Sequence, residues 1–157
     1  MPILEVPWRS PLVVVEAIKD IIKDKVVCEL ECAAGDLMVE MKKYAKDVVG
    51  MELNPDRVLA AKARGLDVVE GDVFTNHIPD ADVYYIWCDA TMIGSIPSII
   101  KKGIWIIASD VPVDERIDEF EAIVNLRLNG YWIDVPYDEG ECWRQRGIMK
   151  LFVTEVL

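Results

Sequence analysis

The sequence predicts a three-layer α/β domain with a mostly parallel sheet and an antiparallel last strand. Two observations lead to this fold class. β-favouring runs alternate with runs of helical periodicity along most of the chain, and the last two β-favouring runs have no helix between them. The chain has 157 residues, 52% of them hydrophobic, which is enough for one sizeable core and too few for two ordinary domains. We therefore expect a single domain over residues 1–157.

The chain opens with a helical pattern followed by the first β-favouring run. Ser10 and Pro11 favour a helix start, as N-cap and first helical residue, and an apolar stripe extends the helix to about Lys23. A β-favouring run covers Lys25–Leu30, and Asp36–Lys46 then has its apolar residues on one helical face. The order is helix, strand, turn, helix.

The same strand and helix pattern then repeats. Asp47–Leu53 reads as a strand, and the pair Asn54 and Pro55 favours the start of a helix that runs to Arg64 and stops at Gly65. Two successive strand and helix units of this kind are typical of a parallel sheet.

Three further strands and two helices follow. The predicted strands are Asp67–Glu70, Asp82–Cys88 and Ile104–Ser109, and the second of these is apolar enough to be covered on both faces. A short helix is predicted around Ser95–Lys102, and a longer one over Ile117–Leu128.

The end of the chain changes this rhythm. Tyr131–Val135 and Gly147–Val156 both read as strands, and the loop between them is too short for a helix, so they should pair as an antiparallel hairpin. The loop at 137–143 is either a lid over a substrate or a solvated connection, and Trp8 either covers the site or packs in the core.

The net charge of −11 argues against anionic partners. A negative field repels phosphate backbones and anionic membrane surfaces, so a nucleic-acid partner is unfavoured. No run of about eighteen apolar residues and no signal-peptide pattern are present, so we expect a cytoplasmic protein without a membrane partner.

The four cysteines do not have the spacing of a zinc site. Cys28 and Cys32 are close in sequence, but no further Cys or His lies near enough to complete a tetrahedron. We expect no metal. Buried thiols are the simplest interpretation, with a Cys32–Cys142 disulfide as the alternative.

Acidic residues follow the first three predicted strands. Ligands of open parallel sheets bind beyond the carboxyl ends of the strands, so these turns should hold any site. Glu29 and Glu31 come with the first strand, Glu52 with the second and Asp72 with the third. A carboxylate ending the second strand can accept both ribose hydroxyls, and one after the third can accept from an adenine amino group. Together these two carboxylates match the polar groups of an adenosine.

At these residues the chain resembles the class I S-adenosylmethionine-dependent methyltransferase family, over essentially its whole length. The family's first motif, an acid followed by GxGxG, falls on Glu29 and Gly35, with Glu31 and Ala33 where the first two glycines are usual. Its ribose acid matches Glu52, and its adenine-side acid matches Asp72. The terminal hairpin is similar to the family's reversed last strand. The resemblance implies the three-layer Rossmann-like methyltransferase fold.

The resemblance also implies a function and a site. The expected cofactor is S-adenosylmethionine, the expected acceptor is a small molecule or a protein, and the expected cofactor-binding residues are Glu29, Ala33, Gly35, Glu52, Leu53, Asp72 and Val73. Asp89 and Asp110, at the ends of the fourth and fifth strands, are the candidate catalytic residues, although Asp89 also fits a helix N-cap.

Two other functions stay open beside the methyltransferase. The first is a non-catalytic cofactor-sensing or protein-interaction module, as a homodimer for example, because two motif glycines are missing. The second, a nicotinamide-dependent oxidoreductase, is disfavoured because no GxGxxG follows the first strand.

Overall fold

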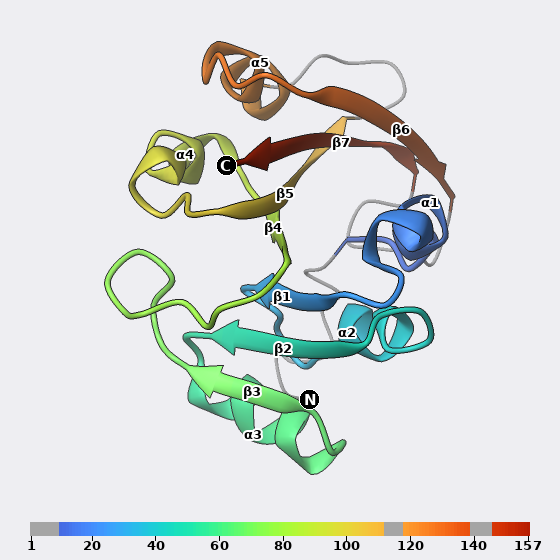
Figure 1. Ribbon diagram of the computed structural model, residues 1–157, viewed down its shortest axis with the longest axis vertical. Coiled ribbons are helices and arrows are strands. Elements are labelled where there is room, and N and C mark those ends of the chain that lie inside the picture. Colours follow the sequence, from blue (N-terminus) through green and yellow to red (C-terminus); the bar gives the residue numbers. More distant parts are fainter. Residues whose placement is uncertain (1–9, 112–117, 139–145) are drawn as a thin grey trace.

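One mixed sheet forms the centre of the molecule. The computed structural model describes residues 10–111, 118–138 and 146–157. Within them, seven strands pair in the order β3-β2-β1-β4-β5-β7-β6 (Figure 1). The strands are β1 (Val26–Leu30), β2 (Asp47–Glu52), β3 (Asp67–Glu70), β4 (Val83–Trp87), β5 (Gly103–Val111), β6 (Tyr131–Tyr137) and β7 (Gly147–Val156).

The strand directions confirm the predicted fold class. β1 to β5 pair in parallel, whereas β7 lies antiparallel between β5 and β6. β6 and β7 form the predicted hairpin, with Tyr131 opposite Val153 and Tyr137 opposite Gly147. All five parallel strands therefore end at the same edge of the sheet, where a ligand would meet the loops that follow them.

Helices cover both faces of the sheet and complete the three layers (Figure 1). One buried cluster joins the sheet to α1, α2 and α3, and the other joins it to α4 and α5. The helices are α1 (Val13–Ile22), α2 (Asp36–Met41), α3 (Pro55–Ala63), α4 (Ala90–Ile93) and α5 (Asp118–Asn125), with a 3₁₀ helix at Ile96–Ser98.

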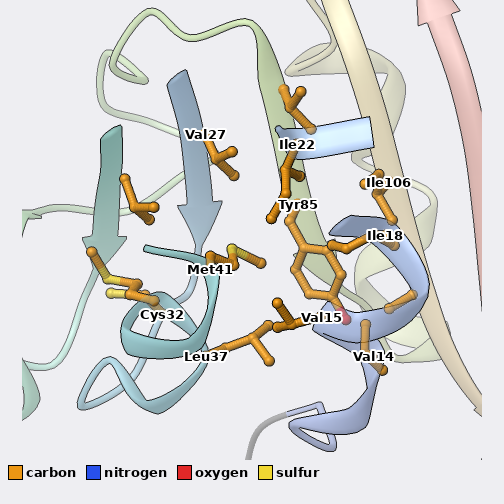
Figure 2. Close-up of a cluster of buried hydrophobic side chains, with 14 of the residues drawn as sticks. Val14, Val15, Ile18, Ile22, Val27, Cys32, Leu37, Met41, Tyr85 and Ile106 are labelled. Carbon is orange, nitrogen blue, oxygen red and sulfur yellow. The ribbon is translucent and has the colours of Figure 1, made fainter. Parts of the chain in front are cut away.

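Apolar periodicity explains how α1 and α2 dock. Val14, Val15, Ile18 and Ile22 of α1 are at most 1% exposed and point toward the sheet, as Figure 2 shows for the cluster that they form. Leu37 and Met41 of α2 belong to the same cluster. Its members from the strands include Val27, Tyr85 and Ile106. Burial of one large aliphatic side chain contributes about 1.5–3 kcal/mol, so this cluster is a principal source of stability.

The predicted start of the first helix is wrong. α1 begins at Val13, and Ser10 does not act as its N-cap. Instead the Ser10 side chain is buried and accepts a hydrogen bond from the Tyr85 hydroxyl of β4. This contact, across 75 residues of sequence, takes Ser10 away from the helix.

The second helix ends earlier than predicted, at Met41 rather than Lys46. The chain there turns back toward the start of β1, where the Lys46 amide donates to the Lys25 carbonyl at 2.9 Å and Lys23 pairs with Ala45 in an antiparallel bridge. These backbone hydrogen bonds compete with the helical ones and stop the helix.

The helix predicted at Ser95–Lys102 is also wrong. α4 starts five residues earlier, at Ala90, and a separate 3₁₀ helix follows. Pro97 lacks an N–H and so cannot continue an α-helical ladder through this segment. α5 ends at Asn125 rather than Leu128, and Arg127 then has a left-handed φ of 55°.

Some predictions lie on residues outside the described ranges. They concern Trp8, Ile117, Cys142 and most of the loop at 137–143. In the described part of the chain, no helix combines the length and the apolar character that crossing a membrane requires.

Candidate functional site

A pocket lies beyond the carboxyl ends of β1 to β4, at the edge where sequence analysis expects a ligand. Its volume is about 580 Å³, within the range of about 300–1,000 Å³ that is usual for small-molecule sites. The residues that line it come from the strand ends and the loops that follow, namely Glu31, Ala33, Glu52, Leu53, Asn54, Pro55, Arg57, Gly71, Asp72, Val73 and Trp87.

The loop after β1 has a backbone shape that glycine normally adopts. Glu31 and Ala33 have left-handed φ values of 59° and 52°, and Gly35 has a φ of 90°. L-residues adopt this region at a cost of about 1 kcal/mol or more. The two motif positions that lack glycine therefore keep a glycine-like backbone and carry strain.

Gly35 shapes this loop from beneath the pocket. It is the N-cap of α2, and a Cβ at this position would overlap the Leu66 side chain. Gly35 is buried and does not line the pocket. Arg64 supports the same loop, because its guanidinium donates to the Ala34 carbonyl at 3.1 Å.

Glu52 ties two loops of the pocket together. Its side chain is 6% exposed; Oε1 accepts from the Ala33 amide at 2.8 Å, and Oε2 accepts from the Asn54 amide at 2.9 Å. A carboxylate oxygen has two acceptor sites, so, as far as the described residues go, each Glu52 oxygen keeps one for a further donor. Two adjacent acceptors of this kind match the two hydroxyls of a ribose.

Apolar residues flank the acids of the second and third turns. Leu53 is 62% exposed at the pocket, whereas Val73 is 3% exposed. Asn54 caps α3 as predicted, because its side chain accepts from the amides of Asp56 and Arg57. The cap fixes the direction in which the chain leaves β2.

Asp72 is both a turn residue and a pocket residue. Its Oδ1 accepts from the Phe74 amide at 2.9 Å, and its own amide donates to Asn76 Oδ1 at 2.8 Å. The alternative interpretation of Asp72 as a turn residue is therefore confirmed. The residue also lines the pocket.

Glu31 titrates unusually because of its surroundings. Desolvation by neighbouring protein atoms, then the negative charges of Glu52, Asp89 and Asp72, raise the pKa of its carboxyl group to about 7. Its side chain is nevertheless exposed at the pocket mouth. Carboxylates from four strand ends thus lie close enough to act on one another.

The two candidate catalytic residues have different environments. Asp89 caps α4, and its Oδ1 accepts from the Thr91 amide and hydroxyl and the Met92 amide. The N-cap interpretation of Asp89 is therefore confirmed. Asp110 is 2% exposed, accepts a hydrogen bond from the Tyr137 hydroxyl and does not line the pocket.

Glu29 lies inside the sheet rather than at the pocket wall. It is 5% exposed, between Gly50 of β2 and Tyr85 of β4. Its negative charge is close enough to contribute to the raised pKa of Tyr85 and of the Cys28 thiol. Its expected contact with a cofactor stays a prediction.

Sequence reasoning missed Arg57 and Trp87 as pocket residues. Arg57 lies in the first turn of α3, directly after the Asn54 and Pro55 start, and Trp87 ends β4. The sequence predicts both the start of this helix and the end of this strand, so the two pocket positions could have been predicted from them.

The cysteines and possible metal ligands offer no second site in the described residues. Cys28, Cys32 and Cys88 are buried free thiols, and Cys142, the partner in the alternative disulfide, lies outside the described residues. Burial raises the pKa of the Cys28 thiol to about 12. The described ranges contain no group of three or more His, Cys, Asp or Glu residues that could hold a metal ion.

No family model and no curated protein matches the sequence. Solved structures do match its fold. The N-methyltransferase NodS from Bradyrhizobium japonicum is similar with a TM-score of 0.66 and 11% identity, over 92% of this chain and 94% of that one. The glycopeptide N-methyltransferase MtfA, solved with sinefungin, has a TM-score of 0.63 and 11% identity, over 95% of both chains.

The chain has the class I methyltransferase fold. The resemblance inferred from the sequence is therefore confirmed at the level of the fold. A protein with a different activity is also similar to it. The precorrin 8w decarboxylase from Methanobacterium thermoautotrophicum matches with a TM-score of 0.65 and 17% identity, over 99% of this chain and 96% of that one. The methyltransferase fold by itself thus does not specify the reaction, which depends on the residues of the pocket.

Proposed function

We propose that this protein is an S-adenosylmethionine-dependent methyltransferase that binds its cofactor in the pocket beside Glu52. The observation that carries the proposal is the placement of Glu52. It is a buried carboxylate at the end of β2 with one acceptor site left on each oxygen, facing a pocket of about 580 Å³. NodS and MtfA, which share the fold, are named as methyltransferases, and this supports the choice of cofactor.

The other pocket residues suit an adenosine. Glu52 would accept from the ribose hydroxyls, and the Asp72 oxygen outside its turn would accept from the adenine amino group. Leu53 and Val73 would contact the faces of the base, which would cover the exposed Leu53 side chain. Ala33 would present its backbone to the ligand in the conformation that its φ of 52° gives it.

Methyl transfer needs few groups from the protein. Bound S-adenosylmethionine supplies an activated methyl group, so the protein has mainly to align an acceptor and exclude water. Asp89 is the candidate to orient or deprotonate an acceptor, because its carboxyl group lies near Glu31 and its cap hydrogen bonds use only Oδ1 among the described residues.

The acceptor that fits this proposal is a small molecule or a protein segment. The acids around the pocket favour a cationic or neutral acceptor over a phosphorylated one, because a phosphate would be repelled. Asp110 would take part in catalysis only if the acceptor reached the end of β5. There the Asp110 carboxylate already accepts a hydrogen bond from the Tyr137 hydroxyl.

Calorimetric titration tests the proposal. The purified protein is titrated with S-adenosylmethionine, S-adenosylhomocysteine and NAD. We expect the first two to bind and NAD not to bind. Failure of both sulfur nucleosides to bind at millimolar concentration would refute the proposal. Binding without methyl transfer to a panel of amines and peptides would favour the non-catalytic sensing module.

Two variants locate the ligand. Asp72→Asn keeps an oxygen for the Phe74 amide and so preserves the turn, but it presents a donor rather than an acceptor to the adenine. We expect about tenfold weaker binding. Glu52→Ala should abolish measurable binding. Glu155→Ala, an exposed change at the opposite end of the strands, is the control and should bind as the wild type does.

A further inference from the structure

The order of the strands sets the direction in which the proposed cofactor would lie. β2 lies between β3 and β1 in the sheet. If the adenine lies at Asp72 after β3 and the ribose at Glu52 on β2, the sulfur-bearing end of the ligand extends toward the end of β1. Glu31 is the carboxylate that lines the pocket there. This step rests on the proposed function.

Glu31 differs from the other three acids in its interactions. Glu52, Asp72 and Asp89 each accept backbone hydrogen bonds that shape a loop or cap a helix. Within the described residues, Glu31 accepts none and forms no ion pair, although it has a left-handed backbone that glycine would adopt more easily. The protein thus holds a charged side chain at this position without a visible folding role for it.

The charges around Glu31 reinforce one another. Glu52, Asp72 and Asp89 face it from the ends of β2, β3 and β4, and the Cys88 thiol is within its field. Arg57 is the single basic residue among those that line the pocket in the described chain. A cation at the end of β1 would therefore relieve the repulsion among these carboxylates.

We propose that Glu31 makes this pocket prefer the cationic S-adenosylmethionine over its neutral demethylated product. The two ligands differ by the methyl group and its positive sulfonium charge, and share the adenosine and amino-acid parts. A carboxylate near the sulfur atom therefore attracts the sulfonium of S-adenosylmethionine and has no such attraction for the neutral sulfur of the product. The consequence is weak inhibition by the product of each turnover.

The size of the effect follows from Coulomb's law. One pair of opposite unit charges about 6 Å apart, at an effective dielectric constant of about 40, changes an equilibrium by roughly tenfold. We therefore expect Glu31→Gln, which keeps the size and removes the charge, to lower the ratio of the two affinities by about tenfold.

The experiment measures the dissociation constants of S-adenosylmethionine and S-adenosylhomocysteine for four proteins. These are the wild type, Glu31→Gln, Glu31→Gly and the control Glu155→Gln. Both Glu31 variants should lose the preference for the cationic ligand by a similar factor, and the control should keep it. Far-UV circular dichroism checks that each variant is folded.

A pH series gives a second readout. The preference of the wild type should increase as pH rises from about 5.5 to 8 and Glu31 loses its proton. Glu31→Gln should show a flatter profile. The sulfonium charge lowers the pKa of the ammonium group in S-adenosylmethionine but not in S-adenosylhomocysteine, so the Glu31→Gln profile serves as the baseline that removes this titration of the ligands.

The outcomes separate this inference from the proposed function. If the wild type binds neither ligand, the proposed function fails and the inference fails with it. If the wild type binds both ligands and Glu31→Gln leaves their ratio unchanged, the function stands and the role of Glu31 is refuted. If only Glu31→Gly alters binding, equally for both ligands, Glu31 acts through its size, which also overturns the charge-based inference.

Discussion

We expect Gly35→Ala to destabilise the protein, because two separate features of Gly35 exclude a side chain. The φ of 90° lies beyond the usual left-handed region of L-residues, and a Cβ would overlap Leu66. Gly35 is the N-cap of α2, whose Leu37 and Met41 belong to the buried cluster shared with α1 and the sheet. A shift at Gly35 would therefore be transmitted to the loop after β1.

The expected magnitude combines these two effects. A left-handed backbone costs an L-residue about 1–2 kcal/mol, and the upper value applies because φ is so far from its optimum. Overpacking costs about 1–3 kcal/mol, and the lower value applies because the end of the Leu66 side chain can rotate away. The sum is about 3 kcal/mol. For a chain of this size that corresponds to a melting temperature roughly 6–12 °C lower.

Urea denaturation followed by circular dichroism measures this change. Ala33→Gly is the matched variant in the same loop, and there the φ of 52° favours glycine. We expect Ala33→Gly to stabilise the protein by up to about 1 kcal/mol, since a strained residue becomes an unstrained one. A loss below 1 kcal/mol for Gly35→Ala, or a clear loss for Ala33→Gly, would refute the reasoning.

Three further predictions concern other parts of the pocket and its support. Gly50→Ala should cost about 2–3 kcal/mol in urea denaturation, because its Cβ would lie 2.6 Å from both Cys32 Sγ and Met38 Sδ; a neutral result would mean that both sulfurs move freely. Leu53→Ser should weaken calorimetric binding of S-adenosylmethionine several-fold without lowering stability, because Leu53 is 62% exposed; unchanged affinity would place the base elsewhere. Finally, the raised pKa of Glu31, about 7 against an unfolded value of 4.5, stabilises the fold below pH 4.5, and this contribution is lost as pH rises through 7. The melting temperature of the wild type relative to Glu31→Gln should therefore fall over that range, and a constant difference would contradict the shift.

Two similar sequence pairs show how far local patterns predict the fold. Asn54 with Pro55 and Ser10 with Pro11 both match a helix start. Asn54 does cap α3, because its side chain meets the amides two and three residues later. Ser10 instead contacts Tyr85, a partner 75 residues away. Local chemistry thus predicted the first case correctly, whereas the second depended on tertiary packing that a sequence pattern does not contain.

The candidate site was predicted in the same uneven way. Glu52 and Asp72 were placed correctly at the pocket because strand ends and turn residues determine where they lie. Gly35 was expected to contact the ligand, yet it is buried against Leu66 and is not among the residues that line the pocket. The negative electrostatic potential at Glu31 could not be predicted from the spacing of residues along the sequence. It depends on carboxylates that the folded chain brings together from the ends of four strands.

The two hydrogen bonds of Glu52 have a consequence for how a ligand binds. They join the loop after β1 to the loop after β2, so neither loop can rearrange without breaking a bond to a buried carboxylate. A ligand then meets a surface that is already ordered and loses little conformational entropy on binding. We expect association in a single kinetic step, without a slow loop closure. The strain at Ala33 would be the energetic cost of this preorganisation, present before any ligand arrives.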